Sequence, residues 1–255
     1  MNYNPYSLEN KTILVTGASS GIGKATAIEC AKLGASLVIT ARNEERLKAV
    51  YNELDRSFDQ VHQMVIADLS TDEGIEKLVQ ETPVLDGVSS NAGISKGIVP
   101  IKFIKDDIMG DILNVNLISH VKLARDLFKK KKLNKEASYV FTASIGGVKS
   151  FSVGNSMYGM SKSAINAFAK FCAVDFASRK IRCNAVCPGM IETPMTGGNG
   201  NVTQEDYEKD KENYLIKRYG RPEEVAWTTA FLLSDASSFI TGTSIFVDGG
   251  ASIVK

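Results

Sequence analysis

Residues 11–33 contain a short strand, a glycine-rich turn and a helix, and this stretch constrains the fold of the chain more than any other. Thr12–Thr16 is apolar and rich in β-branched residues, as in a strand that is buried on both faces of a parallel sheet. Glycines follow at positions 17, 21 and 23, and apolar residues then recur at helical spacing as far as Leu33. The sequence therefore predicts strand, tight turn and helix, in that order.

The glycine turn is suited to hold an anion. Gly17 permits a turn that a Cβ would obstruct, and Gly21 and Gly23 let a ligand and the strand approach the start of the helix closely. The unpaired N–H groups and the positive dipole end of the helix face whatever fills the turn, which favours a phosphate. The spacing differs from the commonest dinucleotide fingerprint, G-x-G-x-x-G, so the turn alone does not identify the ligand.

The rest of the chain alternates strands with helices, and no linker interrupts the alternation. Six further strands are predicted, over residues 34–41, 62–69, 85–93, 138–144, 180–187 and 244–247. Helices are predicted over residues 44–54, 71–80, most of 102–135, 156–176, 205–217 and 223–233. Such alternation builds a parallel sheet with helices on both faces. We expect one α/β domain over residues 1–255, a Rossmann-type doubly wound sheet of seven mainly parallel strands.

Charge, hydropathy and cysteine spacing narrow the class of partner. The chain has 30 Lys and Arg against 29 Asp and Glu, a formal charge of +1, so no overall field favours nucleic acid or a membrane surface. The N-terminus lacks the pattern of a signal peptide, and no apolar run approaches the roughly 18 residues of a membrane span. The four cysteines fit neither a CxxC nor a zinc pattern and are typical of reduced thiols. We expect a cytoplasmic protein with no metal site.

The end of the second strand predicts which nucleotide is bound. In doubly wound folds an acidic residue at this place holds the ribose hydroxyls of the adenosine. This chain has Ala41 there, followed by Arg42 and Asn43. An arginine can hold a ribose 2′-phosphate through charge-assisted hydrogen bonds, so the cofactor is predicted to be NADP. The alternative is that Arg42 is a solvated residue at the start of the next helix.

Two further strand ends carry polar or small residues at the same edge of the predicted sheet. The third strand ends in Asp68-Leu69, and Asp68 either accepts a hydrogen bond from the adenine amino group or caps the next helix. The fourth strand ends in the turn Asn91-Ala92-Gly93, where small side chains leave room for a cofactor.

Asn114 and Asn116 lie inside the predicted helix of residues 102–135. An asparagine amide competes with the helix for backbone groups, so asparagine is a poor residue for a helix interior. Two of them within three residues indicate that at least one has a specific role.

A tyrosine and a lysine four residues apart mark the candidate for proton transfer. Tyr158 and Lys162 share one face of a helix. A tyrosine hydroxyl has a reference pKa near 10, and a nearby ammonium stabilises the phenolate and lowers that pKa. Tyr207 and Lys211 have the same spacing, but only Tyr158 follows a strand that ends in Ser144 and a glycine turn.

In combination these features resemble the short-chain dehydrogenase/reductase family in its single-domain form, over about residues 8–250. Each motif alone is weak, and their order makes the combination specific. The motifs are Thr16-Gly17-x-x-x-Gly21-x-Gly23, Asp68, Asn91-Ala92-Gly93, Asn116, Ser144, Tyr158-x-x-x-Lys162, Pro188-Gly189 with Ile191 and Thr193, and Val247-Asp248-Gly249-Gly250.

The resemblance implies hydride transfer between NADPH and a carbonyl or secondary alcohol, with four catalytic residues. Tyr158 would be the general acid/base, and Lys162 would lower its pKa and bind the nicotinamide ribose. Ser144 would bind the substrate oxygen, and Asn116 would hold a water that links Lys162 to solvent. The cofactor would contact Gly17, Ser19, Ser20, Gly21, Ile22, Gly23, Arg42, Asn43, Asp68, Leu69, Asn91, Ala92, Gly93, Tyr158, Lys162, Pro188, Gly189, Ile191 and Thr193.

The chain departs from the family pattern at three places. Ser90 replaces the first asparagine of the usual Asn-Asn-Ala-Gly, which affects a contact that supports the backbone. The segment between Ser144 and Tyr158 is one residue longer than is commonest, which bears on the shape of the substrate pocket. Ser20 stands where some NADP-using members have a basic residue, so a 2′-phosphate would depend more on Arg42.

The resemblance is strongest to the 3-oxoacyl-(acyl-carrier-protein) reductases of fatty acid biosynthesis. In that branch basic residues dock an acidic carrier protein, and Arg179 and Lys135 with the lysines of 129–132 fall near those places. A solvated surface explains the same lysines. A sugar, polyol or steroid alcohol dehydrogenase and a non-catalytic NADP-binding scaffold are the alternatives. A glycine-rich, charged stretch, 194–217, is expected to be a mobile flap over the substrate.

The family also implies a homo-oligomer, a tetramer or a dimer. Its members pair helices that correspond to residues 111–133 and 155–177 across two-fold axes. Alanines and phenylalanines on the second helix permit such pairing or face the sheet instead. They are Ala164, Ala167, Phe168 and Phe171.

Overall fold

One seven-stranded sheet forms the centre of the molecule in the computed structural model, which describes residues 4–197 and 203–253. Every pairing in the sheet is parallel, and the strand order is β3-β2-β1-β4-β5-β6-β7. The strands are β1 Thr12–Thr16, β2 Ser36–Ala41, β3 Gln63–Ile66, β4 Leu85–Ser90, β5 Leu133–Thr142, β6 Arg182–Pro188 and β7 Ser244–Val247. This order confirms the predicted doubly wound α/β fold, with a sheet that is parallel throughout.

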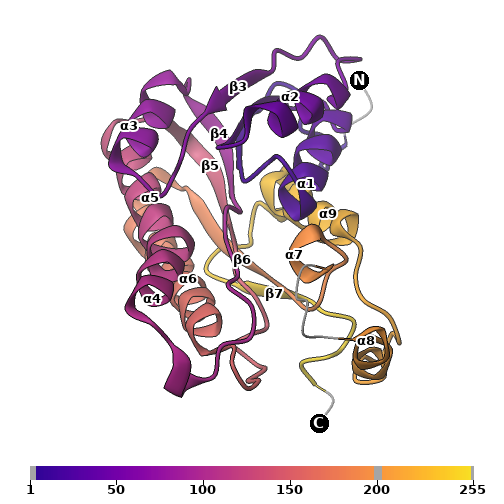
Figure 1. Cartoon of the computed structure of the whole chain (residues 1–255). Helices are drawn as coiled ribbons and strands as arrows, with labels where there is room; N and C mark the ends of the chain where they lie inside the picture. The colour runs from indigo at the N-terminus through magenta and orange to yellow at the C-terminus, as the bar shows by residue number, and fades with distance from the viewer. Residues whose placement is uncertain (1–3, 198–202, 254–255) are drawn as a thin grey trace.

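Helices cover both faces of the sheet (Figure 1). One layer contains α1 Gly21–Lys32, α2 Glu44–Glu53 and α9 Pro222–Leu233. The other contains α3 Asp72–Glu81, α4 Asp106–Leu113, α5 Ser119–Lys129 and α6 Ser156–Asp175. Side chains of β1 alternate between two hydrophobic cores, since Leu14 packs toward the second layer and Ile13 and Val15 toward the first.

The strand order places a topological switch beside β1. Strand β1 pairs with β2 on one side and with β4 on the other, so the connections after β1 and β4 leave the sheet toward opposite faces. In open parallel sheets a crevice forms outside the carboxyl ends of the strands at such a point, and ligands bind there. The turn 17–20 and the turn 91–93 both begin at this edge.

The predicted helix of residues 102–135 differs from the structure in its middle and at its end. A π-helical turn, Asn114–Ile118, separates α4 from α5. Helix α5 ends at Lys129, the backbone reverses at Lys131 with φ of 54°, and β5 begins at Leu133. The start of β5 is missed because 131–135 is charged and lacks alternation, although Leu133 is buried and pairs with Leu85.

The predicted charged helix of residues 205–217 is shorter in the structure. Helix α8 spans Gln204–Lys211. Turns at Glu212 and Asn213 follow it, and they turn the Tyr214 side chain into the protein. A short helix, α7 Pro194–Gly197, precedes it. Part of the predicted flap, 198–202, lies outside the described residues.

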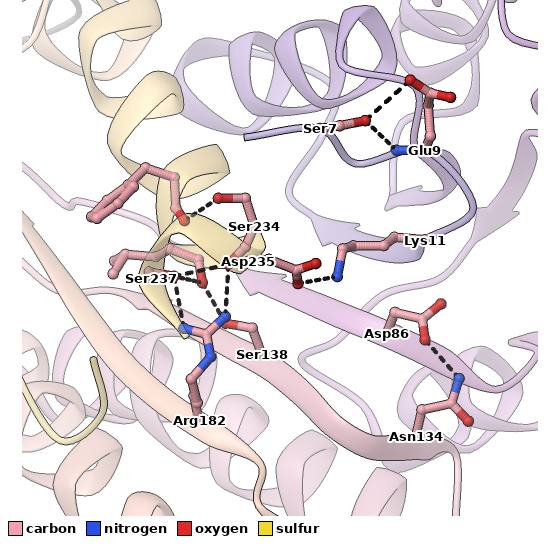
Figure 2. A network of polar contacts seen from close by, with 12 residues as sticks. Ser7, Glu9, Lys11, Asp86, Asn134, Ser138, Arg182, Ser234, Asp235 and Ser237 are labelled. Atoms are coloured by element: carbon pink, nitrogen blue, oxygen red, sulfur yellow. Dashed lines mark hydrogen bonds and ion pairs between the residues drawn. The ribbon is translucent and has the colours of Figure 1, made fainter. Parts of the chain in front are cut away.

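A polar network closes the opposite, amino-terminal edge of the sheet (Figure 2). The Lys11 ammonium pairs with Asp235 at 2.7 Å, and the Arg182 guanidinium donates to the Ser237 hydroxyl at 2.8 Å. The Ser138 hydroxyl donates to the Leu232 carbonyl at 2.6 Å. These bonds join the last turn of α9 and the residues just after it to Lys11, β5 and β6.

Across residues 4–197 and 203–253, the helices are all too short or too polar to cross a membrane. Within the same ranges, no three His, Cys, Asp or Glu side chains are grouped as a metal site requires.

Candidate active site

A groove follows the carboxyl ends of β1 to β5 and contains most of the predicted site residues. The predicted residues that line it are Gly17, Ser19, Ser20, Gly21, Ile22, Arg42, Asn43, Asp68, Leu69, Asn91, Ala92, Gly93, Tyr158, Lys162 and Thr193. The residues that line it without having been predicted include Arg46, Ser70, Ile94, Val115, Thr142 and Met195. The groove thus joins strand ends that lie far apart in the sequence.

The glycine turn after β1 is built around a close contact between strand and helix. Gly17 and Gly21 have positive φ values of 65° and 53°, which glycine adopts without strain. A Cβ on Gly23 would lie 2.2 Å from the Gly17 carbonyl oxygen, so only glycine fits there. The N-cap of α1, Ser20, makes no side-chain hydrogen bond to the helix, and the first turn has no acidic residue. The start of α1 therefore suits a phosphate group of a dinucleotide.

Two arginines line the end of the groove beside β2. Arg42 follows the strand, and Arg46 lies in the first turn of α2. Among the described residues, neither guanidinium forms an ion pair or a hydrogen bond to a carboxylate. Asn43 accepts a hydrogen bond from the Arg46 backbone N–H at 2.8 Å and so caps the helix. Arg46 was missed because the sequence does not show that the first turn of α2 faces the groove.

The structure separates the two alternatives for Asp68. Thr71, not Asp68, is the N-cap of α3, because its hydroxyl accepts the Gly74 N–H at 3.0 Å. One Asp68 carboxylate oxygen accepts both the N–H and the hydroxyl of Ser70, at 2.9 and 2.7 Å. These bonds lower the pKa of Asp68, and the charge of Arg42 contributes to the shift. The aspartate is therefore an ionised acceptor in the wall of the groove.

Tyr158 lies in the first turn of α6, next to the Ser144 hydroxyl. Burial raises the pKa of the tyrosine, and the hydrogen bond with Ser144 opposes that shift. The Ser144 oxygen also accepts the Gly146 N–H at 3.0 Å, which holds the serine at the end of β5. The two hydroxyls therefore lie within hydrogen-bond reach of each other, and Tyr158 lines the groove.

Lys162 lies one helical turn further along, and its side chain is almost completely buried. Its ammonium donates to the Thr142 carbonyl at 2.8 Å and lies 5.9 Å from the centre of the Tyr158 ring. Burial lowers the pKa of Lys162 to about 8. That this ammonium lowers the pKa of Tyr158 stays a prediction, since the contact of the ammonium is with Thr142 and the contact that opposes the raised pKa of Tyr158 comes from Ser144.

Both asparagines of the π-helical turn, one buried and one half-buried, form hydrogen bonds with residues that flank the groove. The Asn116 amide accepts the Ile94 N–H at 2.8 Å and donates to the Ile94 carbonyl at 3.0 Å. It also donates to the Ser161 hydroxyl at 3.2 Å, and the Asn114 amide donates to the Ser70 carbonyl at 2.8 Å. A π-turn, a feature frequent at functional sites, thus fixes both sides of the groove.

Three of the predicted cofactor residues support the loop after β6 and do not line the groove. The Gly189 N–H donates to the Val247 carbonyl at 3.0 Å, and Pro188 ends β6. The Ile191 side chain is buried in the hydrophobic core, so only its backbone can face a ligand. Thr193, by contrast, lines the groove.

Three tyrosines tie α8 to the loop after β6. The Tyr207 hydroxyl donates to the Thr196 carbonyl at 2.6 Å, and the Tyr219 hydroxyl donates to Asp210 at 3.0 Å. The Tyr214 hydroxyl accepts the Met190 N–H at 3.1 Å. The Tyr207–Lys211 pair, which has the same spacing as Tyr158–Lys162, is therefore part of a structural cluster.

Exposed apolar side chains lie on the two loops that lead away from the groove, one after β4 and one just before Tyr158, and this surface is called the apolar entrance. They come from two loops, which the hydrogen bond from the Val99 N–H to the Gly154 carbonyl joins at 2.8 Å. These side chains are Ile98, Ile101 and Phe103 from the first loop and Phe151 and Val153 from the second. An apolar entrance favours a substrate with a hydrocarbon portion.

Comparisons with known proteins find relatives over nearly the whole chain. The family model described as enoyl-(acyl carrier protein) reductase matches residues 17–252. A 3-oxoacyl-(acyl-carrier-protein) reductase of Rickettsia felis is 35% identical, covering 97% of this chain and 99% of the relative. A 3beta-hydroxysteroid dehydrogenase 2 of Eggerthella lenta is 33% identical over 97% of this chain and 96% of its own. The crystal structure of levodione reductase has a TM-score of 0.89 and 30% identity, over 96% of this chain and 98% of that one.

Proposed function

Because the chain belongs to the short-chain dehydrogenase/reductase family, whose members are NAD(P)-dependent oxidoreductases, we propose that it is an NADPH-dependent reductase of 3-oxoacyl thioesters. The observation that carries the proposal is that Tyr158, with Ser144 beside it, and Lys162 line a groove that two arginines also line. The first group suits reduction of a carbonyl, and the second suits a phosphorylated ribose.

The proposed mechanism assigns one task to each polar side chain. The groove residues would hold the nicotinamide cofactor, which would supply a hydride for the carbonyl carbon. The Ser144 hydroxyl donates a hydrogen bond to the substrate oxygen, and the Tyr158 hydroxyl donates the proton to it. Lys162, one turn away, returns a proton toward Tyr158 and holds the ribose hydroxyls. Asn116 fixes the backbone of Ile94, because its amide oxygen accepts the Ile94 N–H and its amide nitrogen donates to the Ile94 carbonyl.

The choice of NADP over NAD follows from charge. A carboxylate at the end of β2 would repel a 2′-phosphate, and Ala41 stands there instead. Arg42 and Arg46 place two guanidinium groups at that end of the groove, each able to bind a phosphate with two parallel hydrogen bonds. The remaining acidic residue, Asp68, lies beside Arg42 and is proposed to accept from the adenine amino group.

The thioester substrate is proposed from the apolar entrance and from the 3-oxoacyl-(acyl-carrier-protein) reductases among the relatives. An acyl-carrier protein is the proposed partner. The Arg179 guanidinium donates to the Leu133 carbonyl, and Lys132 donates to the Thr82 carbonyl, so these two support the fold. Lys135 is exposed and remains available to an acidic partner. A steroid alcohol is the second candidate substrate, because the same apolar entrance suits a steroid and one relative is a hydroxysteroid dehydrogenase.

A homo-oligomer is proposed from the surface of α6. Ala164 and Phe168 are half-buried, and Phe168 packs edge-on against Phe141 of the sheet. Ala167 and Phe171 are exposed, and with Met160 and Val174 they form an apolar stripe along the helix. Sedimentation of the protein and of a Phe171→Glu variant tests this proposal. A monomeric wild-type protein would refute it.

The test of the function is a substrate panel followed by the absorbance of NADPH. The panel contains acetoacetyl thioesters of coenzyme A and of acyl-carrier protein, a 3-oxosteroid and a keto sugar. We expect both thioesters to be reduced, and the thioester of acyl-carrier protein to be reduced faster than that of coenzyme A. Tyr158→Phe should abolish turnover and leave the Kd for NADPH nearly unchanged. Full activity of that variant would contradict the mechanism, and reduction of the steroid alone would replace the thioester by the second candidate.

A further inference from the structure

His120 lies behind the Asn91-Ala92-Gly93 turn, in a place that the proposed mechanism does not use. It belongs to the first turn of α5 and is buried. One ring nitrogen, Nδ1, lies 2.6 Å from the Ser90 hydroxyl, and the other, Nε2, lies 2.7 Å from the Ala92 carbonyl oxygen. The imidazole thus bridges the last residue of β4 and the turn that lines the groove.

We propose that His120 is a positioning residue for the cofactor site: by donating to the Ala92 carbonyl it holds the 91–93 turn in the shape that lets NADP(H) bind against it. The inference depends on the cofactor binding of the family and not on the identity of the substrate. It deepens the proposed function, and its main measurement is binding, so failure of the thioester assay would leave it standing.

The hydrogen-bond partners determine the form of the ring. A carbonyl oxygen only accepts, so Nε2 carries the proton and donates to Ala92. Nδ1 then accepts the hydroxyl proton of Ser90. Burial and the nearby Lys162 ammonium lower the pKa of His120 to about 3, so the ring stays neutral at physiological pH. It acts as a fixed bridge with one donor and one acceptor.

Thr16 and His120 together hold the two peptide groups of Ala92. The Ala92 N–H donates to the Thr16 hydroxyl at 3.1 Å, and the same oxygen accepts the Asn91 N–H at 2.9 Å. Thr16 therefore fixes the amide side of Ala92, and His120 fixes its carbonyl side. Without the imidazole, the carbonyl would be free to rotate and to carry Gly93 with it.

Gly93 lies beside two of the predicted catalytic residues, Lys162 and Asn116. A Cβ built on Gly93 would lie 3.4 Å from both the Lys162 ammonium and the Asn116 amide oxygen. Ala92 and Gly93 both line the groove. A rotated Ala92 carbonyl would therefore change the shape of the groove beside Lys162, and the first effect would be on cofactor affinity.

The sequence pattern gives a second reason to treat Ser90 and His120 as a pair. Ser90 stands where the family usually has the first asparagine of Asn-Asn-Ala-Gly. A serine side chain is shorter than an asparagine side chain and has no amide donor. In this chain the imidazole supplies the donor to the Ala92 carbonyl, and the Ser90 hydroxyl donates to its other ring nitrogen.

Two conservative variants separate the proposed role from simple packing. In His120→Gln the amide nitrogen occupies about the place of Nε2 and can still donate to Ala92, whereas in His120→Asn it occupies about the place of Nδ1 and cannot. We expect His120→Asn to raise the Kd for NADPH at least tenfold, as loss of one buried hydrogen bond predicts. We expect His120→Gln to stay within about threefold of the wild-type Kd, with kcat at saturating NADPH within about threefold for both variants.

His62 provides a matched control, because it is the other histidine of the chain. It is also buried, its Nε2 lies 2.8 Å from the Asp55 carbonyl and its Nδ1 accepts the Leu37 N–H at 3.2 Å, but it does not line the groove. His62→Asn should lower the melting temperature and leave the Kd for NADPH unchanged.

The binding titrations use NADPH fluorescence below the melting temperature of every variant. Equal affinity loss in His120→Asn and His120→Gln, or no loss in either, would overturn the proposal. If His120→Asn does not fold, His120→Phe provides the decisive measurement, because its ring keeps much of the packing and has no donor for the Ala92 carbonyl. A raised Kd for NADPH in His120→Phe would support the proposal, and an unchanged Kd would refute it.

Discussion

Replacing Lys162 by methionine should stabilise the protein without its cofactor at neutral pH while it abolishes turnover. The folded protein buries the ammonium, and burial lowers its pKa from 10.5 to about 8. That difference corresponds to about 3 kcal/mol of unfavourable free energy in the folded state, at 1.36 kcal/mol for each pH unit. Methionine also removes the hydrogen bond to the Thr142 carbonyl, at a cost of about 1 kcal/mol. The variant should therefore be more stable by about 2 kcal/mol at pH 7.

The pH dependence of the stability difference between Lys162→Met and the wild type is a second test of the reasoning. Below about pH 8 the lysine is charged in both the folded and the unfolded protein, so the full cost of burial is present. Between about pH 8 and 10.5 the folded protein releases a proton that the unfolded chain still holds, so the cost falls as the pH rises. Near pH 10.5 only the lost hydrogen bond remains, and the wild type should be the more stable by about 1 kcal/mol.

Urea unfolding followed by circular dichroism, at several pH values and equal protein concentration, measures this difference. Lys48→Met is the matched control, because Lys48 is exposed on α2. Its difference from the wild type should be small and should not change with pH. A Lys162→Met protein that is less stable than the wild type at pH 7, or a difference that stays constant from pH 7 to 10.5, would refute the reasoning.

Four other substitutions test the groove and the segments that support it. Arg42→Ala and Arg46→Ala should each raise the Kd for NADPH about tenfold and leave the Kd for NADH nearly unchanged, since each removes one charged partner of a 2′-phosphate. Equal losses of affinity for both cofactors would contradict this. Gly23→Ala should destabilise the protein and abolish cofactor binding in a calorimetric titration, because its Cβ would lie 2.2 Å from the Gly17 carbonyl oxygen. Tyr207→Phe should raise the substrate KM and spare the Kd for NADPH, because it releases α8 from the Thr196 carbonyl; a change in the Kd alone would argue against that role.

The architecture could be predicted because its signals are local. The alternation of apolar strands with amphipathic helices gives the parallel sheet, and the prediction failed only where local pattern and pairing disagree. Residues 133–135 are polar enough to continue a helix, yet Leu133 pairs with Leu85 and begins β5. Similarly, α8 ends before Tyr214 because that side chain turns inward to accept the Met190 N–H.

The site residues that belong to a continuous motif could also be placed from the sequence. Gly17 and Gly23 are close in the chain, and the contact that requires glycine is a contact between them. Tyr158 and Lys162 share a helix face by their spacing alone. Spacing does not show which way an ammonium turns, and the structure directs the Lys162 ammonium to a carbonyl of another strand.

By itself, the sequence determined the order of strands and helices, the phosphate-binding turn and the set of polar groups available for proton transfer, because each depends on residues within one or two turns of each other. Only the tertiary structure decided that Arg46 joins Arg42, that Ile191 is buried, and that His120 holds Ala92. These pairings depend on which strand ends become neighbours. That is set by packing of the whole sheet, over separations that no local pattern encodes.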